Sequence, residues 1–279
     1  MRNEQVSPEE LLECLGRSGY LIESLIVREL DARGYFVEPN QVLRDPRTGK
    51  SREIDFVAEY FSHVPEHHGL CVKTHFVAEV VNNRLPVVLL THRPLSPNSD
   101  FESYLKFGIT PNPAPFYEKL NIYEEWSPPN EALYAQYCAL TMKKGEQREL
   151  MASHPEDLYS SFQKLSEYVE HELETFQSWS AKNQMDIWRV FSWHPMLVVG
   201  GQLFTVSVDD PENPKVDEIN SAFYEFNWHQ GENRMTTVIE VVQIAALYDR
   251  MASIVARDAA LETNLHALRS TSGNGSEDA

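Results

Sequence analysis

The sequence predicts an α/β protein, because helical and strand-like patterns alternate along the chain. Two helical segments come first, and the spacing of the apolar residues then changes to that of strands. A long helical segment and a second strand-rich block follow, before one last helix. The 279 residues are enough to bury a sizeable core without disulfides or structural metals. We therefore expect a single domain over residues 1–269 and a disordered polar tail over 270–279.

Two helices are predicted at the start of the chain. Ser7 has the properties of an N-cap, and Pro8 with two glutamates after it suits a first helical turn, so a short helix should run to about Gly16. A second helix is expected from about 19 to 33, with Gly34 as its stop. Its apolar residues recur at helical spacing: Leu21, Ile22, Leu25, Ile26 and Leu30.

Strand-like patterns follow the two helices. Four segments show the composition and alternation of strands: 35–43, 52–61, 71–81 and 86–91. Residues 92–130 then hold seven of the 16 prolines. A connection of this length is usually functional or an insertion, so we expect a proline-rich insertion here.

The second half of the chain predicts more helices and strands. Helices are expected over about 130–144 and 155–178, and the last helix over about 245–268. The strand-rich block covers 187–208, 219–227 and 236–244. Within it, Gly200 and Gly201 predict a hairpin turn.

The charge of the chain limits the kinds of partner. Lys and Arg total 24 against 42 Asp and Glu, which gives a net charge of −18. This balance argues against electrostatic binding of nucleic acid or of an anionic membrane by the whole protein surface, but not against a local basic groove. Residues 16–95, however, hold ten basic and ten acidic residues, so this stretch tolerates a polyanion better than the rest.

The cysteines and the chain start favour a reducing compartment. Cys14, Cys71 and Cys138 are far apart and odd in number, which is not typical of a disulfide framework or a CxxC zinc site. The acidic, polar N-terminus is unlike a signal peptide, and the apolar runs are too short to span a bilayer. We therefore expect a cytoplasmic protein without a membrane partner.

Two carboxylates interrupt otherwise apolar predicted strands. Asp55 lies between Ile54 and Phe56, and Glu79 lies between Ala78 and Val80. A charge in such a strand costs free energy unless it is paired or binds a cation. Carboxylate oxygens are the ligands that Mg²⁺ prefers. The pattern therefore predicts a magnesium or manganese site that includes Asp55 and Glu79.

The order of these acids resembles the PD-(D/E)XK nuclease superfamily. The segments that carry the resemblance are Gly19–Glu23, Gly49–Asp55 and Val77–Val88. It implies an αβββαβ core with a restriction-endonuclease-like mixed sheet, extended here by further strands and helices. It also implies that Asp55 and Glu79 hold a divalent metal, that the carbonyl of Val80 is a third ligand, and that Glu23 supports the site from its helix.

One position departs from the family pattern. The motif ends in a lysine two residues after the acid of the third strand, and here that position is Val81. Lys73 shares the face of Glu79 but lies roughly 20 Å away along the strand. Three other residues are candidates for the missing group: Asn83, Arg84, and Lys164 from the helix at 155–178.

The resemblance implies a divalent-metal-dependent nuclease that hydrolyses phosphodiester bonds, with DNA favoured over RNA as its partner. Asp55, Glu79, Glu23 and Asn83 are then the expected catalytic residues, and Mg²⁺ or Mn²⁺ the cofactor. The alternative is a degenerate nuclease fold that has lost catalysis and acts as a binding or scaffold module. Val81 favours that alternative, whereas the three retained acids favour the enzyme.

Overall fold

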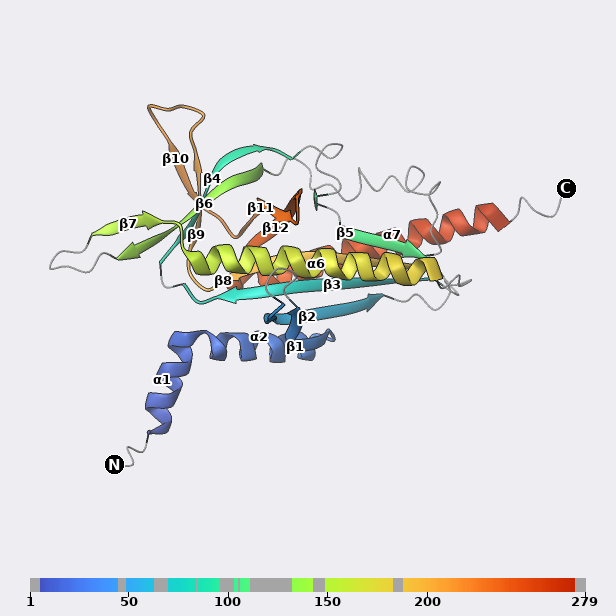
Figure 1. Ribbon diagram of the computed structural model, residues 1–279, viewed down its shortest axis with the longest axis horizontal. Helices are drawn as coiled ribbons and strands as arrows, with labels where there is room; N and C mark the ends of the chain where they lie inside the picture. Colours follow the sequence, from blue (N-terminus) through green and yellow to red (C-terminus); the bar gives the residue numbers. More distant parts are fainter. Residues whose placement is uncertain are drawn as a thin grey trace.

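The computed structural model is an α/β fold with one large mixed sheet and helices on both of its faces (Figure 1). The α/β class predicted from the sequence is therefore confirmed. The structure describes residues 6–44, 49–62, 70–83, 85–95, 103–104, 106–110, 132–142, 149–182 and 188–273.

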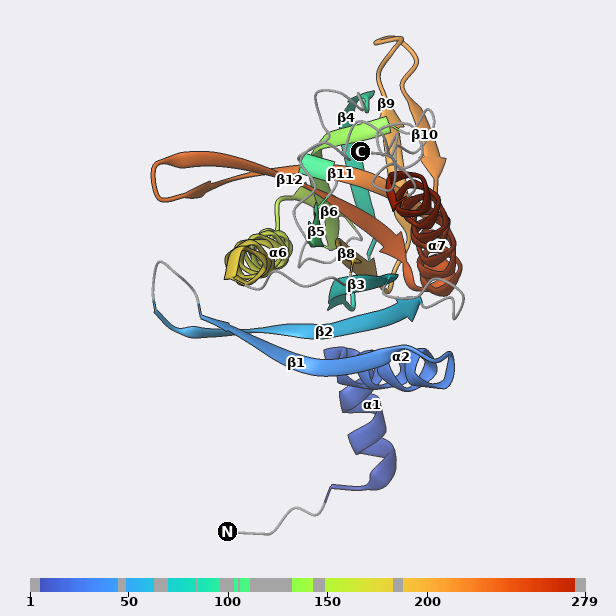
Figure 2. The same cartoon turned by 90° about the vertical axis from the view of Figure 1, so that its right-hand side faces the viewer.

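Two N-terminal helices form where the sequence predicts them: α1 (Pro8–Ser18) and α2 (Tyr20–Ala32). The Ser7 hydroxyl accepts from the Glu10 N–H at 3.1 Å, and the Glu10 carboxylate accepts from the Ser7 N–H at 2.9 Å, which completes a capping box. The helices meet at Gly19, whose φ of 95° suits a residue without a side chain. No residue of α1 is buried, and Figure 2 shows this helix extending away from the body of the molecule.

The segment from α2 onward builds one edge of the sheet. The strands β1 (Phe36–Arg44), β2 (Ser51–Ser62) and β3 (Leu70–Val81) pair antiparallel in that order. The helix α6 (Glu156–Lys182) leads into β8 (Trp188–Val199), and β8 pairs parallel with β3 along its whole length. All five of these elements lie close to their predicted positions.

The remaining strands extend the sheet beyond β8. They are β12 (Asn233–Gln243), β11 (Ser221–Gln230), β6 (Ala132–Met142), β4 (Val87–Pro94), β9 (Leu203–Ser207) and β10 (Lys215–Glu218). The order across the sheet is β1-β2-β3-β8-β12-β11-β6-β4-β9-β10. Two short strands lie off this path: β5 (Lys106–Thr110) pairs with β8, and β7 (Leu150–Ser153) pairs with β6.

Helices cover the two faces of the sheet separately (Figure 2). α6 packs on one face, where Phe162 and Leu165 meet Val77 of β3. The other face is covered by α2 and by α7 (Leu247–Gly273), which follows the short helix η1 (Ile244–Ala246). A residue on β2 or β3 therefore faces either α6 or the pair α2 and α7.

The prediction of a helix over 130–144 is wrong, because this segment forms β6. Leu133, Tyr137 and Ala139 are buried, and their spacing is even, as in a strand. The strand pairs antiparallel with β4. Ala, Leu and Gln give the segment a helical composition, but pairing with β4 overrides that weak preference.

The hairpin predicted at Gly200 and Gly201 is also wrong. β8 and β9 flank these glycines but do not pair, because β9 pairs with β4 and β10 instead. A Cβ on Gly201 would lie 2.5 Å from the carbonyl oxygen of Asn83. The close approach of the chain after β3, rather than a tight turn, therefore requires glycine here.

Two further boundaries differ from the expectation. α7 continues to Gly273, so the predicted disordered tail does not begin at residue 270, and 274–279 lie outside the described residues. Within the predicted insertion, β4 extends to Pro94 and β5 forms a strand, while 111–131 lie outside the described part. The single domain over 1–269 stays a prediction.

Candidate active site

Asp55 lies where β2 separates from β3. In a regular strand, residues two apart share a face. Ile54 packs on the α6 face but Phe56 packs on the opposite face, so the strand is irregular at Asp55 between them. The β2–β3 ladder begins at the pair Phe56 and Ala78. Just before it, Oδ2 of Asp55 accepts from the backbone N–H of Val80 at 2.7 Å. The carboxylate of Asp55 thus continues the strand pairing in place of a backbone carbonyl.

Glu79 faces α6 from near the C-terminal end of β3 and is only 2% exposed. Its Oε2 accepts from the Ser161 hydroxyl at 3.0 Å and forms an ion pair with Lys164. Its other oxygen, Oε1, is buried and has no hydrogen-bond partner among the described residues. One side of this buried carboxylate is therefore satisfied, and the other is not.

Lys164 extends from α6 to the break between β2 and β3. Its Nζ donates to the backbone carbonyl of Glu53 at 3.1 Å and pairs with Glu79. The side chain is 20% exposed, so the ammonium group lies at the border between the core and solvent. A lysine from another element is thus placed beside the two strand acids.

Glu23 completes the cluster from α2. Glu23 and Asp55 line the same pocket, which lies between α2, β1 and β2. A Cβ on Gly19 would lie 3.4 Å from Oε1 of Glu23, so the carboxylate folds back over the start of its helix. The structure therefore brings Glu23, Asp55 and Glu79 to one region, in agreement with their order in the sequence.

Burial and like charge raise the pKa values of all three acids. For Glu79, burial comes first and the charge of Asp55 second, and together they outweigh Lys164 and Ser161 to give a pKa of about 7. Burial likewise raises the pKa of Asp55. For Glu23, burial and then the charge of Asp55 raise the pKa. A cluster of acids with raised pKa values in a cleft is typical of functional sites.

The other predicted site residues lie elsewhere. The Asn83 amide donates to the Leu85 carbonyl at 2.7 Å, and Asn83 lies beyond the end of β3, roughly 13 Å along the strand from Glu79. It does not meet the carboxylates. Arg84 is outside the described residues. Lys73 pairs with Glu59 at 2.6 Å, and roughly 20 Å along β3 separate it from Glu79.

Asp55 and Glu79 are the residues that fit a divalent cation here. Mg²⁺ is usually held by one or two carboxylates together with water, and the unpartnered Oε1 of Glu79 is an oxygen donor of the required kind. Val80 donates its N–H to Asp55, and the metal role of its carbonyl stays a prediction. Among the described residues no three His, Cys, Asp or Glu side chains group as metal ligands, so this pair would rely on water or substrate for the rest.

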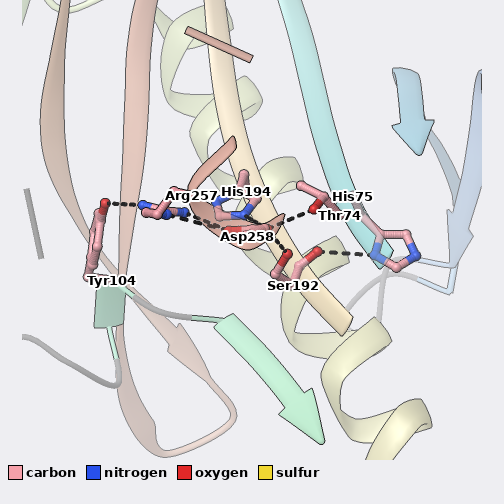
Figure 3. A network of polar contacts seen from close by, with 7 residues as sticks. All are labelled: Thr74, His75, Tyr104, Ser192, His194, Arg257 and Asp258. Atoms are coloured by element: carbon pink, nitrogen blue, oxygen red, sulfur yellow. Dashed lines mark hydrogen bonds and ion pairs between the residues drawn. The ribbon is translucent and has the colours of Figure 1, made fainter. Parts of the chain in front are cut away.

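A second buried carboxylate, Asp258 of α7, lies on the opposite face (Figure 3). Its Oδ2 accepts from Thr74 at 2.7 Å and from Ser192 at 2.6 Å, and His194 Nε2 lies 3.4 Å away. Its Oδ1 accepts from Arg257, whose Nη2 is 3.3 Å away. This cluster ties α7 to β3 and β8 and leaves neither oxygen of Asp258 without a donor.

Sequence reasoning missed Asp258 and Ser161. Asp258 falls in the buried stripe of α7 between Ile254 and Leu261, and that spacing was the available signal. Ser161 lies three residues before Lys164, on the same side of α6.

Comparison with family models, with curated proteins and with solved structures gives no match to this chain. No helix in the described part of the chain is both long enough and apolar enough to cross a bilayer. The argument for function therefore depends on the site itself.

Proposed function

We propose that the protein is a divalent-metal-dependent nuclease, with its active site at the break between β2 and β3. The observation that carries the proposal is the meeting of Asp55, Glu79 and Lys164 at that point. Two strand acids and a lysine are the residue types that the resemblance requires, and only the element that supplies the lysine differs.

The order of the elements supports the same proposal. The elements of this half of the sheet occur along the chain in the order α2, β1, β2, β3, α6 and β8. The first three strands are antiparallel to one another, and β8 is parallel to β3. α2 and α6 pack on opposite faces. This arrangement agrees with a restriction-endonuclease-like αβββαβ core, in which β4 to β7 are inserted before α6.

In this proposal Asp55 and Glu79 hold the cation, which when bound makes a water more acidic and stabilises charge on the phosphate. Lys164 has three N–H donors, of which two go to Glu79 and to the Glu53 carbonyl, so the third can donate to a water or to a phosphate oxygen. Because Val81 carries no polar group, Lys164 takes over the role of the motif lysine. Glu23 would support the cluster from α2.

The proposed substrate is nucleic acid and the proposed cofactor is Mg²⁺ or Mn²⁺. The test is cleavage of single- and double-stranded DNA and RNA with either ion. Asp55→Asn and Lys164→Met should each lower the rate roughly 10²–10⁴-fold. Asp217→Asn, on the exposed strand β10, is the matched control and should cleave like the wild type.

A second measurement separates the enzyme from a scaffold. Bound Mn²⁺ should raise the melting temperature of the wild type, because it stabilises the folded state, and the rise should vanish in Asp55→Asn. A rise without cleavage of any substrate would favour the degenerate binding module. No rise and no cleavage would reject the metal site altogether. The cytoplasm, where its free cysteines would stay reduced, remains the predicted compartment.

A further inference from the structure

The pocket beside Asp55 is a feature of the site that the proposed reaction does not use. It has a volume of about 630 Å³ and lies between α2 and the strands β1 and β2. Asp55 and Glu23 lie in its lining, so the pocket is continuous with the candidate active site. Whatever occupies it would lie next to the group that reacts.

The lining suits a flat, partly apolar ring. Val27 of α2 and Val37 and Pro39 of β1 supply apolar surface. Tyr20 also lines the pocket and is 65% exposed, so its ring is free to stack on another one. Base–aromatic stacking tolerates any sequence, because every base has a π-face.

Arg28 gives the pocket its one basic side chain. It is exposed, and it forms no ion pair with the residues that the structure describes. Arg28 lies five positions after Glu23, which is roughly 7.5 Å along the axis of α2. The other charged side chains of the lining are acidic and repel an anion: Glu23, Asp31 and Asp55. A phosphate in this pocket would therefore bind at Arg28.

The size of the pocket limits the form of the ligand. Its volume falls in the range of about 300–1,000 Å³ that holds one small molecule. A base can enter such a pocket only when it is unstacked, and the cost of unstacking is smallest in a single strand. A paired duplex therefore does not fit.

We propose that this pocket binds one nucleotide of a single-stranded nucleic acid, with Tyr20 on its base and Arg28 on its phosphate. The proposal depends on the nuclease function and names the substrate class: a single strand rather than a duplex. The bound nucleotide lies next to the one that is cut, because Asp55 lies in the lining of the pocket.

Binding is measured by fluorescence anisotropy with a labelled single-stranded oligonucleotide and with the same sequence as a blunt duplex. The titrations are made in EDTA and in Ca²⁺, a hard cation that binds oxygen ligands with looser geometry than Mg²⁺. The variants are Arg28→Ala and Tyr20→Ala, with Arg28→Lys and Tyr20→Phe as conservative partners. Arg17→Ala, at an exposed ion pair on α1, and Tyr159→Ala on α6 are the controls.

Wild type should bind the single strand more tightly than the duplex. Arg28→Ala should weaken binding roughly tenfold and lower the salt slope by about 0.7, the value for one phosphate contact on a single strand. Tyr20→Ala should weaken it roughly fivefold or more without changing that slope. The conservative partners should retain most of the affinity, and both controls should bind like wild type.

Three results would overturn the subsite: no binding of the single strand in either condition, equal affinity for the duplex, or unchanged affinity in both alanine variants. The fate of the nuclease function is read separately. Binding that depends on Arg28 and Tyr20 without any cleavage keeps the subsite and rejects the nuclease. If cleavage depends on Asp55 but Arg28→Ala and Tyr20→Ala both bind like wild type, the nuclease function is kept and the subsite is rejected.

Discussion

Glu79 and Asp258 are buried to the same degree and behave in opposite ways. They are 2% and 1% exposed, and each lies on a covered face of the sheet. Burial raises the pKa of Glu79 to about 7. Burial also acts to raise the pKa of Asp258, but the hydrogen bond and charge of His194, the charge of Arg257 and the hydroxyl of Ser192 lower it to about 2.

The difference lies in the partners and not in the burial. Both oxygens of Asp258 have donors, whereas among the described residues only Oε2 of Glu79 has any. Glu79 also lies near the charge of Asp55, while Asp258 has Arg257 beside it. A buried carboxylate with complete partners stabilises the fold, and one with an oxygen left over is available for a ligand.

The largest effect expected from this contrast is the loss of Asp258. Asp258→Asn removes the ion pair between Asp258 and Arg257 and replaces the carboxylate that accepts from the hydroxyls of Thr74 and Ser192 with an amide. We expect a loss of about 3–5 kcal/mol in the free energy of unfolding, measured by urea denaturation. Asp217→Asn, on exposed β10, should change it by less than about 0.5 kcal/mol. A loss below about 1 kcal/mol for Asp258→Asn would show that the cluster is not structural.

The pH dependence of the free energy of unfolding should reveal the contribution of Glu79. Its pKa is about 7 in the folded protein against an ordinary 4.5, so the folded state binds the proton more firmly than the unfolded state. Its contribution is therefore full below pH 4.5 and is lost as the pH rises through about 7. That loss should be roughly 3 kcal/mol.

Glu79→Gln cannot titrate and should remove this part of the dependence. The measurement is the free energy of unfolding of the wild type minus that of the variant, at several pH values between 4.5 and 8. The difference should fall with rising pH. A difference that is constant across this range would contradict the raised pKa of Glu79.

The sequence predicts the acids well because strand patterns make them conspicuous. Asp55 and Glu79 stand out in apolar strands, and the structure brings them together with Glu23. The change of face at Asp55 was not predictable, since it requires the ladder to begin only at Phe56. Local residues single out the acids and strand pairing sets their geometry, while their role at a site stays a prediction.

Contacts between distant segments are what the sequence predicts least. Lys164 was one of three candidates for the missing lysine, and only the packing of α6 on β3 brings its Nζ to Glu79. β6 was mistaken for a helix because its pairing with β4 is not visible in its composition. Asp258 was missed, since its donors come from β3, β8 and α7 and are not visible in the local sequence.

Removal of the lysine should have a moderate effect that depends on pH. Lys164→Met removes the ammonium group that pairs with Glu79, so we expect the free energy of unfolding to fall by about 2 kcal/mol at pH 8. At pH 5 most of Glu79 is protonated, and the loss should shrink to well under half. Urea denaturation at both pH values measures this difference.

Lys73→Met is the matched control for that variant. Lys73 pairs with Glu59, and although burial acts to raise the pKa of Glu59, hydrogen bonds from His75 and Lys73 lower it to about 2. Glu59 stays ionised at pH 5, so Lys73→Met removes an ion pair at both pH values and should destabilise the protein at pH 5 as well as at pH 8. If both variants respond to pH alike, the raised pKa of Glu79 is not the cause.

The smallest effects concern the two serines that donate to the carboxylates. Ser192→Ala removes a hydrogen bond of 2.6 Å to Asp258, which is ionised throughout, so we expect a loss of about 1–2 kcal/mol at both pH 5 and pH 8. Ser161→Ala removes a bond of 3.0 Å to Glu79, and a bond to an ionised acceptor is roughly twice as strong as one to a neutral group. Its loss of about 1 kcal/mol at pH 8 should therefore fall by about half at pH 5. Equal losses at the two pH values for Ser161→Ala would mean that Glu79 is ionised at pH 5, and would remove the contrast with Asp258.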